Sequence, residues 1–240
     1  MPRLREQPEA RDVPFVPWDE FIRDHFVWNQ GEHLTTIGKT GSGKTNLLLQ
    51  LLPYRDFVCA IGTKPKDETM QTLIRRDKYR RVREWPPPTR IGARSVRVAL
   101  WPTFVRPEDI ADQQRIIDAA LRDIFAAGGW TIVLDELWYL CVFLRMSRLL
   151  EVFWSQARSI GITVVGGAQR PAWIPLMAYS QATHLFMFKT TDHRDVMRLG
   201  SVGGIDAKLI ADTVGRLPKW HVLYVNTVDG TLLITKPEKR

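Results

Sequence analysis

Residues 38–45 read GKTGSGKT and meet the pattern G-x-x-x-x-G-K-[ST], which narrows the possible folds more than any other feature of this chain. A short β-rich run precedes the pattern at 33–37, and an apolar run with helical character follows it until Pro53. A glycine-rich turn between a strand and a helix exposes consecutive backbone N–H groups, and the helix dipole adds positive potential. The pattern therefore predicts a strand–loop–helix unit that binds phosphate groups.

The residue types within this loop suit the phosphates of ATP. Gly41 and Gly43 let the backbone approach the phosphates, Lys44 reaches the β- and γ-oxygens, and the Thr45 hydroxyl is a ligand for Mg²⁺. The residues that we expect to bind the nucleotide are Gly38, Thr40, Gly41, Ser42, Gly43, Lys44, Thr45 and Asn46. ATP and Mg²⁺ are the expected cofactors.

Apolar runs of strand length alternate with helical patterns beyond the first 30 residues. The expected strands are residues 33–37, 57–61, 96–100, 130–134, 162–166, 184–188, 221–225 and 231–235, and the longest expected helices are 108–127 and 139–159. Several strands are apolar on successive residues, which indicates burial on both faces of a largely parallel sheet in a three-layer α/β fold. The last two strands are expected to form a hairpin. We expect residues 1–30 to be an N-terminal arm or strap and 31–240 a single domain.

The strand expected at 130–134 ends in two adjacent carboxylates, Asp135 and Glu136. The carboxyl end of a strand is where α/β proteins place their ligand sites. Asp135 is expected to hold Mg²⁺, and Glu136 to orient or deprotonate an attacking water molecule. This pair favours hydrolysis of the bound nucleotide over transfer of a phosphate to another acceptor.

A second buried strand leads into Gln169, Arg170 and Pro171. Because an amide side chain both donates and accepts hydrogen bonds, Gln169 is suited to contact the γ-phosphate or the attacking water. A glutamine that merely caps a loop at the end of a strand is the alternative interpretation of this segment.

The loop GKTGSGKT, the strand that ends in Asp135 and Glu136, and residues 158–171 (RSIGITVVGGAQRP) together resemble the FtsK/HerA superfamily of P-loop motor ATPases. Residues 217–230 resemble the last hairpin of that group. The resemblance implies a three-layer P-loop NTPase core of the RecA-like (ASCE) type, and a hexameric or pentameric ring of identical chains that moves double-stranded DNA. It implies catalytic roles for Lys44, Glu136 and Gln169.

The resemblance also implies an arginine that completes the site of a neighbouring subunit. Arg158 is the best match, although its Arg-Ser-Ile-Gly turn departs from the commoner Arg-Lys-x-Gly form. Arg170, Arg145 and Arg148 are the rival candidates for this role, and a surface or salt-bridged arginine is the alternative for each.

The net charge of +8 makes an anionic partner plausible, and residues 75–83 contain six Lys or Arg side chains. Those residues are either a solvated helix end and loop or a surface that contacts DNA phosphates. No run of apolar residues is long enough to cross a membrane, and the two cysteines, Cys59 and Cys141, are expected to be buried thiols. The chain is therefore expected in the cytoplasm, or in a virus particle.

In its short length, the chain resembles the genome-packaging ATPases of some viruses. A capsid or portal partner is expected for such a protein. Three alternatives remain at this stage: a DNA-transfer motor of conjugation or mobile elements, a morphogenesis ATPase of filamentous phage, and a small-molecule kinase with the same phosphate loop. A nucleotide-gated scaffold that hydrolyses slowly is a further, non-motor alternative.

Overall fold

The computed structural model describes residues 13–87, 94–170, 175–190, 192, 194, 195, 198 and 206–239. Residues 1–12 of the expected arm, Pro88 and Pro171 lie outside this set. Within the described residues, one sheet of nine strands dominates the architecture, in the order β3-β4-β2-β5-β6-β1-β7-β8-β9. The strands are β1 (Leu34–Ile37), β2 (Phe57–Ile61), β3 (Arg80–Val82), β4 (Val96–Leu100), β5 (Thr131–Leu134), β6 (Thr163–Ala168), β7 (His184–Phe188), β8 (Val222–Asn226) and β9 (Leu232–Thr235).

The first seven strands pair in parallel, whereas β8 pairs antiparallel with β7 and with β9. All eight expected strands are present, with bounds shifted by at most two residues, and the C-terminal hairpin is confirmed. The α-helices are α1 (Trp18–Glu20), α2 (Lys44–Leu51), α3 (Glu68–Arg75), α4 (Ile110–Ala127), α5 (Ser147–Gln156), α6 (Met177–Ser180) and α8 (Ala207–Arg216). Among the described residues, no helix combines the length and the apolar character that crossing a bilayer requires.

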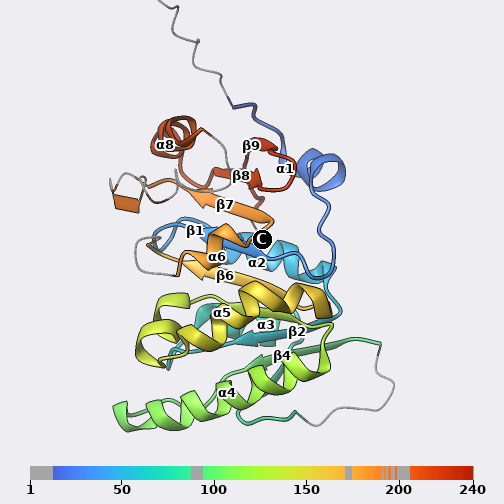
Figure 1. Ribbon diagram of the computed structural model, residues 1–240, viewed down its shortest axis with the longest axis vertical. Helices are drawn as coiled ribbons and strands as arrows, with labels where there is room; N and C mark the ends of the chain where they lie inside the picture. The colour runs from blue at the N-terminus through green and yellow to red at the C-terminus, as the bar shows by residue number, and fades with distance from the viewer. Residues whose placement is uncertain are drawn as a thin grey trace, which may run out of the picture.

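Helices cover both faces of the sheet, which gives three layers (Figure 1). Side chains of α4, α5, α6 and α8 share one apolar cluster, and those of α1, α2 and α3 share another. Successive residues of β2 alternate between the two clusters, with Cys59 in the first and Val58 and Ala60 in the second. This alternation follows from the two-residue period of a strand and confirms the expected burial on both faces.

The described part of the N-terminal segment, from residue 13 onward, packs against the sheet. Phe15 bridges to Ile234 of β9, while Phe21 and Phe26 are buried against Phe186 and Tyr224 of the sheet. These aromatic side chains are part of the core, so the described residues of the strap pack with the rest of the chain. A boundary near residue 30 stays a prediction.

The single helix expected over 139–159 is wrong in detail. The segment is a π-helical turn (Tyr139–Phe143), then α5, then a 3-10 turn (Ala157–Ile160). Between the first two pieces Arg145 has a φ of 51°, in the left-handed region that no helix residue occupies. Apolar side chains continue at helical spacing across this break, which is why the sequence pattern did not reveal it.

The basic stretch 75–83 is also more ordered than expected. It contains the end of α3 and the edge strand β3, which the sequence analysis missed. Tyr79 and Val82 are buried, whereas Arg80 and Arg81 are exposed and Arg81 stacks on Trp101 at 4.5 Å. Because exposed basic residues also protect edge strands from pairing with other chains, this position by itself does not assign a DNA contact.

Candidate active site

The phosphate loop connects β1 to α2 at the carboxyl ends of the parallel strands, where β5 and β6 also end. Gly43, the residue before α2, has a φ of 116°, which side chains with a Cβ rarely adopt. A cavity of about 620 Å³ opens at these carboxyl ends of the strands. It is lined by Thr40, Gly41, Gly43, Lys44, Thr45, Asn46, Leu49, Lys64, Lys66, Asp67, Glu68, Thr69, Asp135, Glu136 and Gln169. The fold therefore brings nearly all of the expected site residues together.

Three of the expected site residues lie outside this cavity, namely Gly38, Ser42 and Arg158. Ser42 lines a neighbouring cavity, and Gly38 contributes its carbonyl oxygen to a contact with Lys44. Lys44 is buried, and its Nζ donates to the carbonyl oxygens of Gly38 and Lys39 at 2.5 and 3.2 Å. Burial lowers the pKa of this ammonium, although the charges of Asp135 and Glu136 oppose that shift. The ammonium group of Lys44 therefore lies against the backbone of the loop itself.

A chain of oxygen atoms joins the loop to the strand β5. Thr45 Oγ1 lies 3.2 Å from Thr69 Oγ1, which in turn donates to Asp135 Oδ2 at 3.4 Å. Asp135 Oδ1 is buried and has no hydrogen-bond partner among the described residues, and burial raises the pKa of this carboxyl group. An unsatisfied buried carboxylate oxygen beside a hydroxyl fits the oxygen ligands that Mg²⁺ prefers.

Glu136 is held from two sides. Lys64 forms an ion pair with Glu136 Oε1, and Gln169 Nε2 donates to both carboxylate oxygens at 3.3 and 3.4 Å. Thr40 Oγ1 of the phosphate loop donates to Gln169 Oε1 at 3.2 Å. Burial lowers the pKa of Lys64, but its hydrogen bond to Glu136 and the charge of Glu136 outweigh burial, so the net shift is upward. Gln169 thus links the phosphate loop to the carboxylate expected to act on water.

Sequence and structure comparisons identify relatives of this arrangement. No family model matches the chain. The DNA packaging ATPase P9 of Enterobacteria phage PRD1 is 22% identical over 216 residues, which cover 87% of this chain and 88% of that protein.

Solved structures give the same result for the fold. The DNA-packaging ATPase B204 of Sulfolobus turreted icosahedral virus has a TM-score of 0.61 at 15% identity, over 88% of this chain and 100% of that one. The conjugation coupling protein TcpA of pCW3 has a TM-score of 0.52 at 16% identity, over 96% of this chain and 71% of that one. The chain therefore has the fold of these solved structures. This confirms the expected fold class and the resemblance noted in the sequence.

The arginine expected to act in trans lies far from the phosphate-loop cavity of its own chain. Arg158 lies in the turn that precedes β6, at the amino ends of the parallel strands. Its Nη2 donates a hydrogen bond to Thr183 Oγ1 at 2.6 Å. Arg170 forms ion pairs with Asp192 and Asp195, while Arg145 and Arg148 are exposed near the start of α5. The choice among these arginines stays a prediction.

Sequence reasoning missed Lys64 and Thr69, which contact Glu136 and Asp135 respectively. It also missed Gly167, which lies beside Asp135 on the neighbouring strand. A polar residue after β2 and a threonine at the start of α3 are too common to single out in one sequence. Only the pairing of β2 with β5 shows that they face the two carboxylates.

Asp67 caps the helix that carries Thr69 into the site. Its Oδ1 accepts a hydrogen bond from the backbone N–H of Met70 at 3.0 Å, at the N-terminus of α3. We expect Asp67→Ala to lower the free energy of unfolding by about 1 kcal/mol, the usual cost of a lost N-cap. Urea unfolding measures this, and Asp67→Asn is the matched control because asparagine also caps helices. Equal losses in both variants would show that the cap is not what Asp67 contributes.

Proposed function

We propose that this chain is an ATP-hydrolysing motor that packages or translocates double-stranded DNA, as part of a ring of identical subunits. The observation that carries the hydrolytic part is the contact of Gln169 with both Glu136 and Thr40. This contact connects the group expected to act on water with the loop expected to bind the phosphates. Relatives named as ATPases, and a solved complex of the genome packaging NTPase B204 with ATP-gammaS at a TM-score of 0.56, support nucleotide hydrolysis.

We assign one or more residues of this chain to each step of nucleotide binding and hydrolysis. Lys44 binds the β- and γ-phosphate oxygens, and the N-terminus of α2 adds positive potential to the same site. Thr45 and Asp135 would hold Mg²⁺, which neutralises charge on the phosphates when it is bound. Glu136 accepts a proton from, or orients, the attacking water, and Gln169 keeps that carboxylate in place until nucleotide enters.

DNA is proposed as the substrate that is moved. P9 and B204 are named DNA-packaging ATPases, and the chain carries a net charge of +8. A ring of five or six subunits, with an arginine such as Arg158 supplied by a neighbour, would complete each site. A capsid or portal partner and a place in the host cytoplasm or the virus particle follow from the packaging role. Conjugative DNA transfer is the second candidate, since TcpA shares the fold over most of this chain.

The test is the rate of ATP hydrolysis with and without duplex DNA. We expect duplex DNA to raise the rate of the wild-type protein, and Lys44→Ala to hydrolyse no ATP under either condition because the phosphate-binding ammonium is lost. Phosphate release measured at several salt concentrations checks this, because phosphate contacts weaken steeply as salt increases.

A rate that DNA leaves unchanged would contradict the motor proposal. Appearance of a phosphorylated small molecule in place of free phosphate would favour the kinase alternative. Slow hydrolysis that responds to neither DNA nor a metabolite would favour the scaffold alternative.

A further inference from the structure

Trp220 is an exposed aromatic residue beside the phosphate loop to which the proposed mechanism gives no role. It lies in the turn before β8, and its φ of 65° is unfavourable for an aromatic residue. Half of its surface is exposed (51%). β8 runs antiparallel to β7, and its first residue, Val222, lies opposite Phe188, the last residue of β7. The turn before β8 therefore lies at the carboxyl ends of the parallel strands, as the phosphate loop does. The backbone therefore holds a large flat side chain next to the expected nucleotide site.

A second cavity continues from the phosphate site toward Trp220. It measures about 770 Å³ and is lined by Gly43, Asn46, Phe188, Trp220, Lys236, Pro237, Glu238 and Lys239. It shares Gly43 and Asn46 with the cavity that the loop lines. A Cβ at Gly43 would lie 3.1 Å from the ring of Phe188 and 3.8 Å from Trp220 Cδ1. Both aromatic rings thus border the last glycine of the loop.

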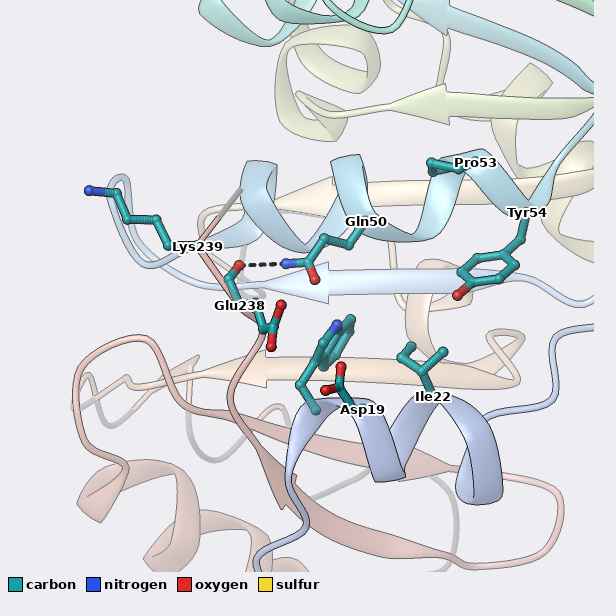
Figure 2. A pocket seen from close by; sticks show the side chains of 8 residues that line it. Asp19, Ile22, Gln50, Pro53, Tyr54, Glu238 and Lys239 are labelled. Carbon is teal, nitrogen blue, oxygen red and sulfur yellow. Dashed lines mark hydrogen bonds between the residues drawn. The ribbon is translucent and has the colours of Figure 1, made fainter.

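The C-terminal segment after β9 also lines this cavity, and it is fastened to α2. Asn46 Nδ2 and Gln50 Nε2 both donate to the main-chain oxygen of Glu238, the second at 2.6 Å. Figure 2 shows the Gln50 contact, with the segment crossing beside α2 above the strap residues Asp19 and Ile22. The cavity is therefore lined both by an anchored C-terminal segment and by two aromatic rings.

A smaller cavity of about 390 Å³ also borders Trp220 and the loop. Its lining includes Lys39, Lys189, Lys219 and His221, and Lys219 Nζ lies 4.5 Å from the Trp220 ring centroid. So many basic groups suit an anion better than an uncharged ring. The larger cavity, with its proline and two aromatic residues, is the better match for a flat uncharged base.

We propose that Trp220 stacks on the base of the bound nucleotide, with the base in the cavity between Trp220 and residues 236–239. This inference rests on the nucleotide binding contained in the proposed function and adds the part of the ligand that the phosphate loop does not contact. Every base has a π-face, so stacking supplies affinity without selecting one base.

The test compares ligands with and without a base. In Trp220→Ala we expect the Kd for ATP and ADP to rise about tenfold, equivalent to about 1.4 kcal/mol, while the Kd for tripolyphosphate stays unchanged. Isothermal titration calorimetry measures all three. We expect Trp220→Phe to recover most of the affinity, because a flat aromatic ring is kept. Tyr54→Ala is the matched control, since Tyr54 is an exposed aromatic residue (63%) that lines neither nucleotide cavity.

An unchanged Kd for ATP in Trp220→Ala would overturn the inference, and so would an equal loss for ATP and tripolyphosphate. Unchanged tripolyphosphate binding also shows that the variant is folded around its phosphate loop. The proposed motor function fails separately, through a hydrolysis rate that ignores DNA, and that result leaves the comparison of ATP with tripolyphosphate intact.

Discussion

Glu136→Gln is expected to bind ATP with the Kd of the wild-type protein but to hydrolyse it roughly 10²–10⁴-fold more slowly, the usual contribution of a general base. The substitution keeps the size of the side chain and removes its negative charge. Gln169 Nε2 keeps an oxygen acceptor at this position, so the site is expected to keep its geometry. Single-turnover hydrolysis and calorimetric titration of ATP measure the two quantities separately.

The matched control for this variant is Glu151→Gln, an exposed carboxylate in α5 that lines none of the cavities at the site. We expect this control to hydrolyse ATP at the wild-type rate. Near-normal hydrolysis by Glu136→Gln would contradict the assignment of Glu136 as the residue that acts on water. A parallel loss of ATP binding would instead assign Glu136 to holding the nucleotide.

Gly167→Ala is expected to abolish hydrolysis and to lower the free energy of unfolding by about 1–3 kcal/mol, the usual cost of an overpacked site. A Cβ at Gly167 would lie 2.5 Å from the carbonyl oxygen of Asp135 and 2.6 Å from its Oδ1. These atoms belong to Asp135, which directly follows the neighbouring strand β5, so relieving the clash requires the backbone after β5 or the carboxylate to move. ATP hydrolysis below the unfolding transition, and urea unfolding followed by circular dichroism, measure the two effects.

Gly215→Ala is the control, because a Cβ at Gly215 in α8 meets no atom within 4 Å. We expect it to be neutral or stabilising by about 0.4–1 kcal/mol, since alanine lowers the entropy of the unfolded chain. If Gly167→Ala were as stable and as active as this control, the close approach of β6 to Asp135 would not matter for the site.

The phosphate loop and the paired carboxylates were predictable because each is a local arrangement. The residue types at 38–45 fix a turn between β1 and α2 through their own backbone preferences, and Asp135 and Glu136 follow an apolar strand directly. Alternating strands and helices likewise imply a parallel sheet, because the connection between parallel strands requires a crossover. These local patterns therefore predict the fold class and the placement of the site at the carboxyl ends of the strands.

The break at Arg145 and the edge strand β3 could not be predicted in this way. Helical periodicity continues across Arg145, so the local pattern is the same whether the chain bends there or not. The strand β3 has three residues, two of them exposed arginines, and its conformation depends on pairing with β4. For β3, pairing with a neighbouring strand decides a conformation that its own residues do not specify.

The sequence by itself predicted which residues bind phosphate and which carboxylates end the strand beside them, because those signals are contained in short segments. Only the tertiary structure decided that Lys64 and Gln169 hold Glu136, that Gly167 leaves room for Asp135, and that Trp220 lies beside Gly43. The physical reason is the order of the strands in the sheet. The residues at the ends of β2, β6 and β8 come close to the loop after β1 only because these strands belong to the same sheet. Pairing of this kind joins residues that lie far apart in the sequence, and no local pattern records it.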